Sequence, residues 1–156
     1  MSTYRQPTVY VMCGVPASGK TYYAKNTLMN NILHHRVYIS SDDIREEICG
    51  DAQDQTKNQE VFKLFYNRAR KAVREGSDVV LDATHLTRRS RQKCRERFKD
   101  LDCKFIVVQL TTPVGKAIRR NKNRDRVVPS YAMDRMINSF QPVKNSEGFD
   151  EVWRVS

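Results

Sequence analysis

Residues 14–21 read Gly-Val-Pro-Ala-Ser-Gly-Lys-Thr and match the pattern G-x-x-x-x-G-K-[ST] at every fixed position. An apolar run at residues 8–13 precedes this octapeptide, and a helix is expected from Thr21 to about Asn31. Glycines let the backbone curl so that successive N–H groups converge on phosphate oxygens, and the helix N-terminus adds partial positive charge. The strand-then-helix context disfavours the alternative of a purely structural glycine turn. The octapeptide therefore predicts a phosphate-binding loop.

This loop is expected to bind a nucleoside triphosphate, either ATP or another NTP, together with Mg²⁺. Lys20 is expected to reach the β- and γ-phosphates, and the hydroxyl of Thr21 to ligate the metal. Small or rigid residues between the two glycines suit a tight turn. The residues expected to bind nucleotide here are Gly14, Val15, Pro16, Ala17, Ser18, Gly19, Lys20 and Thr21.

The rest of the chain alternates between apolar runs and helical patterns. Further strands are expected at residues 37–40, 78–83, 105–110 and 151–155. Further helices are expected at residues 42–48, 59–74, 88–99 and 113–123, and a last one with Pro129 at its first position. This alternation predicts an α/β fold with a five-stranded parallel sheet flanked by helices. The 156 residues suit a single domain, residues 1–156.

Positive charge is concentrated in one part of the sequence. The formal net charge is +10, and residues 88–126 contain fourteen basic and four acidic residues, which accounts for all of it. A field confined to one segment favours a polyanionic partner. The alternative is that the basic helix expected at residues 88–99 only presents a solvated face.

The composition also bounds the compartment and excludes some sites. There are four cysteines without a C-x-x-C pair and three histidines, so neither a zinc site nor a disulfide framework is expected. No apolar run reaches transmembrane length, and the N-terminus has no signal-peptide pattern. A cytoplasmic protein without a membrane partner is the expectation.

A candidate catalytic pair follows the second expected strand. Asp42 comes at the strand's carboxyl end, where an open α/β sheet binds its ligands. A kinase needs a carboxylate that accepts the proton of the acceptor hydroxyl, and Asp42 suits that role. Arg45 lies one helical turn later and could hold an acceptor phosphate. The alternative is that Ser41 or Asp42 only caps the helix.

The third expected strand ends in a second carboxylate. Asp82 resembles the Walker B residue that holds Mg²⁺ or orders the loop. Thr84 and His85 follow at the same rim and are candidates for substrate contact. For His85 the alternative is an ordinary surface histidine.

An arginine-rich stretch at residues 119–126 follows the fourth expected strand and its helix. Arg120 and Arg124 are spaced i, i+4, so they share one helical face. Arginines on a mobile lid can close over a triphosphate and neutralise charge in the transition state. The alternative is a frayed, soluble helix end, which the presence of the phosphate-binding loop disfavours.

These motifs together resemble the P-loop polynucleotide 5′-kinases, namely the kinase domain of bacterial end-healing proteins and the phage-type polynucleotide kinase. The resemblance covers nearly the whole chain and rests on G-V-P-A-S-G-K-T, I-S-S-D-D-I-R, D-Q-T, L-D-A-T-H and R-N-K-N-R. It implies a P-loop kinase fold with an arginine-rich lid and the strand order 2-3-1-4-5. The implied reaction is transfer of the γ-phosphate of ATP, or another NTP, to the 5′-hydroxyl end of DNA or RNA.

The resemblance also implies roles for individual residues. Asp42 would be the general base, and Arg45 would bind the 3′-phosphate of the acceptor. Arg120 and Arg124 would contact the donor phosphates, so the expected catalytic residues are Asp42, Lys20 and Arg124. Ser41 would help to order the metal, alongside Thr21 and Asp82.

The chain departs from that family in two respects. The family usually has Asn where this chain has His85. The end-healing relatives carry phosphatase or ligase domains on the same chain, and this sequence shows neither, so the expectation is either a stand-alone kinase or one that works with separate phosphatase or ligase partners. Two other functions stay open: a zeta-toxin-like kinase of a nucleotide sugar or an antibiotic, and a nucleic-acid-binding ATPase without phosphotransfer.

Overall fold

The computed structural model describes residues 4–30 and 33–156. In chain order the elements are β1 (Thr8–Cys13), α1 (Lys20–Tyr23), the π-helical turn η1 (Ala24–Leu28), β2 (Arg36–Ser40), α2 (Ser41–Cys49), α3 (Asn58–Arg74), β3 (Asp78–Asp82), α4 (Arg88–Glu96), β4 (Lys104–Leu110), α5 (Val114–Lys122), α6 (Ser130–Ser139), the 3₁₀ turn η2 (Asn145–Glu147) and β5 (Glu151–Val155).

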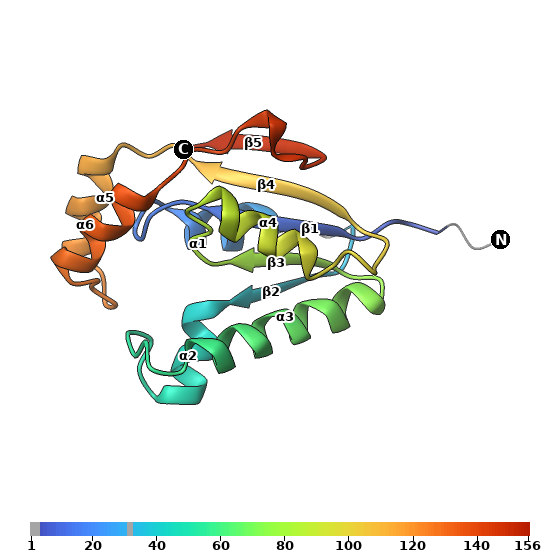
Figure 1. Cartoon of the computed structure of the whole chain (residues 1–156), viewed down its shortest axis with the longest axis horizontal. Helices are drawn as coiled ribbons and strands as arrows, with labels where there is room; N and C mark the ends of the chain where they lie inside the picture. Colours follow the sequence, from blue (N-terminus) through green and yellow to red (C-terminus); the bar gives the residue numbers. More distant parts are fainter. Residues whose placement is uncertain (1–3, 31–32) are drawn as a thin grey trace.

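The five strands form one parallel sheet in the order β2-β3-β1-β4-β5 (Figure 1), which confirms the predicted fold class and strand order. Ser40 at the end of β2 is in register with Asp82 at the end of β3. The carboxyl ends of the strands therefore meet at one edge, where the segments after β1, β2 and β3 begin.

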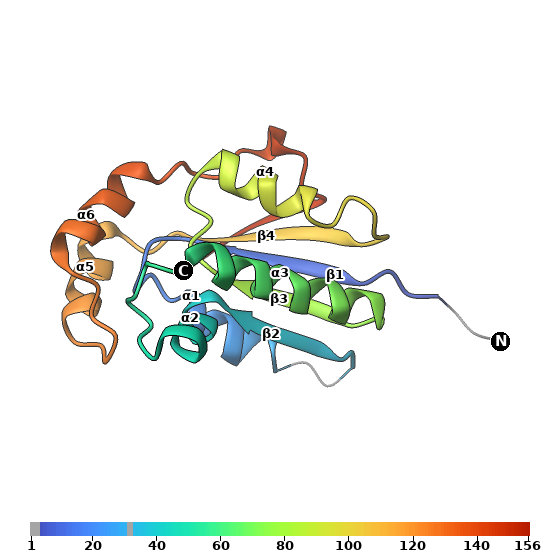
Figure 2. The same cartoon turned by 60° about the horizontal axis from the view of Figure 1, so that its bottom comes forward.

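The sheet is covered on both faces, because alternate residues of a strand point to opposite sides. Val9 and Val11 of β1 pack in a core with α3 and α4 on one face. Tyr10 and Met12 pack with α1 and η1 on the other face. Helices α5 and α6 lie beyond the carboxyl ends of the strands in both views (Figures 1 and 2).

The expected elements match the structure within a few residues, and three ends differ for local reasons. Helix α4 ends at Glu96 rather than near Lys99, because the turn tightens and Arg97 N bonds to two carbonyls. Pro129 caps α6 instead of opening it, since its ψ of 144° is extended. The helix after the loop was predicted to extend to about residue 31, which lies outside the described residues. It ends at Leu28, because the described residues 29 and 30 are not helical.

Candidate active site at the carboxyl edge of the sheet

The loop at residues 14–19 joins β1 to α1, as the sequence predicted. Gly14 N donates to Thr84 O at 3.0 Å, which ties the loop to the end of β3. A Cβ at Gly14 would lie 2.7 Å from Ser18 Oγ, and Gly19 has a φ of 101°. Both positions therefore require glycine, because a side chain would clash at the first and strain the backbone at the second.

Lys20 extends from the first turn of α1 back across the loop. Its side chain is buried, and Nζ donates to Val15 O at 2.9 Å. Burial lowers the pKa of Lys20 and the nearby charge of Arg124 lowers it further, whereas Asp82 and Asp42 raise it. The two carboxylates and Arg124 therefore lie close enough to interact with the Lys20 ammonium.

Thr21 and Asp82 meet at the same edge. Thr21 Oγ1 donates to Asp82 Oδ2 at 2.7 Å, and Asp82 is buried. Tyr38 donates its hydroxyl to the same carboxylate oxygen. Burial raises the pKa of Tyr38, so the phenol keeps its proton and remains a donor. The sequence reasoning missed Tyr38. The alternation along β2 would have placed it on one face with Ser40, but only strand pairing brings it to Asp82.

These oxygens fit an Mg²⁺ ion accompanying a bound nucleotide. Hydroxyl and carboxylate oxygens are ligands that Mg²⁺ prefers, and the ion usually takes only one or two from protein. In the described part of the chain, no three His, Cys, Asp or Glu side chains gather to hold a metal. A site completed by phosphate oxygens and water, rather than by a protein cage, suits this arrangement.

The candidate base Asp42 is not a helix cap. Ser40 Oγ accepts from Asp43 N at 3.2 Å, so Ser40 caps α2 and the alternative of a capping role for Ser41 or Asp42 is wrong. The Asp42 carboxylate is half-exposed and accepts from Arg45 Nη1 at 2.9 Å. This leaves the carboxylate accessible from solvent while its orientation is fixed.

Asn58, which the sequence reasoning also missed, holds the other side of Arg45. Its Oδ1 accepts from Arg45 Nε at 3.3 Å and from Nη2 at 3.1 Å. Gln55 Oε1 in turn accepts from Asn58 Nδ2 at 2.9 Å. Because Asn58 opens α3, only the packing of α3 on α2 brings these residues together.

The remaining rim residues lie deeper than expected. Ser41 is buried behind the loop edge, and Thr84 is partly buried. His85 is 6% exposed, so the interpretation as a surface histidine is wrong. Its Nδ1–H donates to Met12 O at 2.7 Å, and burial lowers the pKa of His85 to about 4. The ring is therefore neutral at pH 7. Contact of Thr84 or His85 with substrate stays a prediction.

The arginine-rich stretch forms the end of α5 and a loop that leads to α6. Asn121 closes this loop through both backbone groups of Val128, at 2.7 Å and 2.9 Å. Arg120 Nη1 lies 3.7 Å from where a Cβ on Gly19 would stand. This places Arg120 beside the phosphate-binding loop, and the charge of Arg124 also lowers the pKa of Lys20 in that loop.

The basic helix expected at residues 88–99 does not present all of its arginines to solvent, so the alternative of a solvated face does not hold for Arg91 and Arg95. Arg91 is fully buried and forms an ion pair with Glu147, Nε to Oε1 at 2.8 Å. Arg95 Nη1 donates to Glu147 O, and its guanidinium lies over the rings of Phe105 and Phe149. Two positive charges of this basic segment, those of Arg91 and Arg95, thus lie in or against the core.

The glycine-rich loop after the first strand, the order 2-3-1-4-5 and the helices beyond the strand ends define a P-loop kinase fold. The sequence profile of the AAA domain family AAA_33 matches residues 9–143. The chain belongs to this family, and the fold implies nucleotide binding. No curated protein sequence matches the chain at a significant level.

Several solved structures share the fold. One is a chain of the Pnkp1/Rnl/Hen1 RNA repair complex, with a TM-score of 0.75 and 18% identity over 96% of this chain and 51% of that one. Kti12 from Chaetomium thermophilum, in complex with ADP-AlF3, has a TM-score of 0.72 and 14% identity over 96% and 89%. A fungal RNA kinase has a TM-score of 0.66 and 17% identity over 99% and 76%.

Other kinases are similar as well, among them a sugar kinase and a gluconokinase from Sinorhizobium meliloti. This chain spans about half the length of the RNA repair chains that it matches. The resemblance drawn from the sequence motifs is confirmed at the level of family and fold.

Among the described residues, no helix is long and apolar enough to cross a membrane.

Proposed function

We propose that this chain is a polynucleotide 5′-kinase, which transfers the γ-phosphate of ATP or another NTP to the 5′-hydroxyl end of DNA or RNA. The observation that carries the proposal is the Asp42–Arg45 pair at the carboxyl edge, with the Asp42 charge acting on Lys20. A carboxylate beside a phosphate-binding loop suits a hydroxyl acceptor, and an arginine beside that carboxylate suits an acceptor that carries phosphate.

Asp42 would accept the proton of the 5′-hydroxyl as the new O5′–P bond forms and the bond to the leaving nucleoside diphosphate breaks. Lys20, Arg120 and Arg124 would neutralise charge on the transferring group and on the donor phosphates. Mg²⁺, when bound at Thr21, Ser41 and Asp82, would add charge neutralisation at the same phosphates.

Arg45 would bind the acceptor phosphate with the N–H groups that its protein partners leave available. Asp42 and Asn58 take three of its five N–H groups. Within the described chain this leaves one N–H on each terminal nitrogen, which is the fork geometry that binds phosphate. A 3′-phosphate of the acceptor nucleotide would fit this edge, and Thr84 and His85 are proposed to lie near the same acceptor.

The similarity to a chain of an RNA repair complex and to a fungal RNA kinase supports a nucleic-acid acceptor. Separate phosphatase or ligase partners fit the same picture. The similarity to a gluconokinase and a sugar kinase supports the second candidate, a small-molecule kinase. The basic residues of 88–126 that remain exposed, such as Arg88, Arg89 and Arg120, favour the polyanionic acceptor.

The test is incubation with γ-labelled ATP, Mg²⁺ and a 5′-hydroxyl oligonucleotide, with label on the oligonucleotide as the expected result. Asp42→Asn should lower kcat by about 10²–10⁴-fold while binding of ATP and oligonucleotide persists. Its neighbour Asp43→Asn is the matched control and should lose far less. Free phosphate alone would indicate an ATPase, and label only on added sugars would indicate the small-molecule kinase. A near-normal kcat in Asp42→Asn would refute the assignment of the base.

A further inference from the structure

The lid is the arginine-rich stretch at residues 119–126. Arg126 joins it to α2, the helix that carries the candidate base Asp42. It lies in the loop between α5 and α6, and its Nη1 is 3.2 Å from Asp43 Oδ1 on α2. Its Nη2 donates to the carboxylate of Glu46, one helical turn further along α2. These partners are 83 and 80 residues away in sequence, so the contact is purely tertiary.

The position of Arg126 links it to the phosphate-binding loop. Arg124 lies two residues earlier in the same loop, and its charge reaches Lys20. Asn121 closes the loop through Val128, so Arg124 and Arg126 lie in one short closed segment. A contact that holds Arg126 on α2 therefore also restrains the position of Arg124.

The strength of the contact suits a lid that must open. The side chains of Arg126, Asp43 and Glu46 are 37%, 48% and 54% exposed. Ion pairs with such exposure are weak and are screened by salt, so a closed lid would be favoured only severalfold over an open one. A stronger link would slow the release of nucleotide.

We infer that Arg126 is a positioning residue, which holds the lid closed over the bound nucleotide through Asp43 and Glu46 and thereby places Arg120 and Arg124 against the phosphates. The inference rests on the proposed function in one respect, namely that the lid arginines contact the donor phosphates. It assigns Asp43 and Glu46 to lid closure, while Asp42 on the same helix faces the acceptor.

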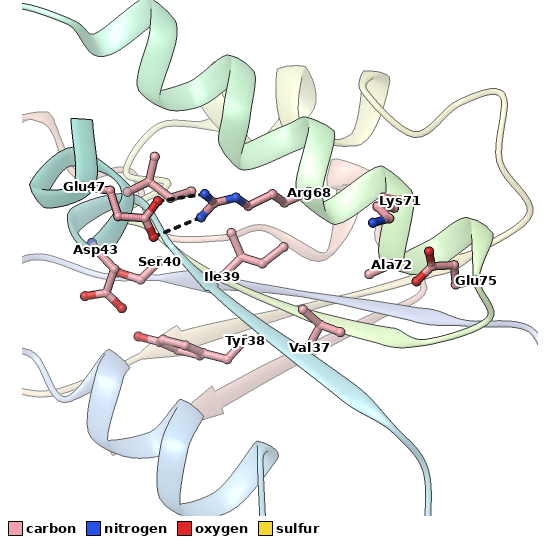
Figure 3. Close-up of a pocket in the computed structure, with 11 residues that line it drawn as sticks. Val37, Tyr38, Ile39, Ser40, Asp43, Glu47, Arg68, Lys71, Ala72 and Glu75 are labelled. Carbon is pink, nitrogen blue, oxygen red and sulfur yellow. Dashed lines mark hydrogen bonds and ion pairs between the residues drawn. The ribbon is translucent and has the colours of Figure 1, made fainter.

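A second ion pair on α2 supplies a matched control. Arg68 on α3 pairs with Glu47 at 2.7 Å, with exposures of 43% and 53%. This pair lines a cavity of about 340 Å³ between β2, α2 and α3, and Asp43 lies at the same cavity (Figure 3). It is as exposed as the Arg126 contacts and uses the same helix, but it joins α2 to α3 instead of to the lid.

The experiment measures the rate at which a fluorescent N-methylanthraniloyl-ATP leaves the full chain in the presence of Mg²⁺. Arg126→Glu should speed release about threefold to tenfold, as expected for the loss of two exposed ion pairs. The exchange Arg126→Glu with Glu46→Arg should restore much of the slow release, and Arg126→Lys should retain part of it. Arg68→Glu should leave the rate unchanged. In the wild type, added salt should speed release, and in Arg126→Glu this dependence should shrink.

Unchanged release in Arg126→Glu would overturn the inference, as would equal acceleration in Arg68→Glu or a failure of the charge exchange to recover slow release. These variants are at exposed positions, and matching thermal unfolding midpoints verify that each is folded. The outcome is separate from the proposed reaction. If release follows the expected pattern but no oligonucleotide is labelled, the role of Arg126 is supported and the polynucleotide acceptor is refuted. If the oligonucleotide is labelled but nucleotide release is unchanged in Arg126→Glu, only the role of Arg126 is refuted.

Discussion

Helix α4 and the lid are both rich in arginine, yet the structure uses their charges in opposite ways. In α4, Arg91 is fully buried, on one helical face with the buried Cys94. In the lid, Arg120 is exposed and Arg124 is half-buried, and both lie beside the phosphate-binding loop. The difference shows that a high density of basic residues does not by itself mark a binding surface.

The physical reason lies in what each segment packs against. Helix α4 crosses the sheet, so every third or fourth side chain must enter the core. At Arg91 the core supplies Glu147 and the carbonyls of His85 and Gln141 as acceptors. The lid lies beyond the strand ends and has no sheet beneath it. Its arginines are therefore available to an anion from outside.

The largest expected effect concerns the lid. Arg124→Ala should lower kcat by on the order of 10³-fold if Arg124 acts as an arginine finger supplied in cis. Arg120→Ala should raise the KM for ATP or lower kcat. Thermal unfolding midpoints should hardly change, since neither side chain is buried in the core. Wild-type kinetics in both variants would show that the lid arginines take no part in catalysis. The contrast with α4 would then no longer hold.

The buried arginine should show the reverse pattern. Arg91→Met should lower the free energy of unfolding by about 3–5 kcal/mol, because Glu147 would remain buried without its partner. Urea unfolding measures this loss, and the double variant Arg91→Met with Glu147→Gln should recover part of it. A decrease in the free energy of unfolding below about 1 kcal/mol would show that the guanidinium of Arg91 is solvated and not buried.

His85, whose carbonyl accepts from Arg91, should make stability sensitive to acid. Burial lowers the pKa of His85 to about 4, below the ordinary value near 6.5, so the unfolded chain binds the proton more tightly. Stability is therefore complete above pH 6.5 and falls as the pH drops toward 4, by about 2 kcal/mol at pH 5 for this group. His85→Asn removes the titration, and the difference in unfolding free energy between pH 7 and pH 5 should shrink by that amount. An equal difference in both proteins would contradict a buried, neutral imidazole.

The smallest effect concerns the exposed charges of α4. Oligonucleotide binding should weaken with salt, and the slope reports the number of phosphate contacts. Reversing Arg88 and Arg89, which open α4 at the carboxyl edge, should reduce the slope by about one unit per lost contact. Reversing Arg97 and Lys99, at the other end of the segment, should leave it unchanged. If reversing either pair of residues leaves the salt dependence of oligonucleotide binding unchanged, the exposed charges of α4 do not contact the oligonucleotide.

Local sequence signals account for what could be predicted of the site. The fixed spacing of Gly14, Gly19 and Lys20 identifies the loop without knowledge of any distant residue. Asp82 could be placed because it ends a strand and Asp42 because it lies just after one, and parallel strands end at one edge. Tyr38 and Asn58 could not, because each acts through a residue on another element. The Ser40 cap was missed for a different reason: its bond to Asp43 N is local, but α2 begins at Ser41, one residue before the expected start.

The sequence by itself determined the alternation of strands and helices and the chemistry of the loop, because both depend on residues close together in the chain. Only the tertiary structure decided which charges are used and which are buried. Arg91 and Arg126 have the same side chain, and one lies in the core with Glu147 while the other bridges the lid to Asp43. A guanidinium takes its role from the acceptors that surround it, and packing brings those acceptors from elements far away in the sequence.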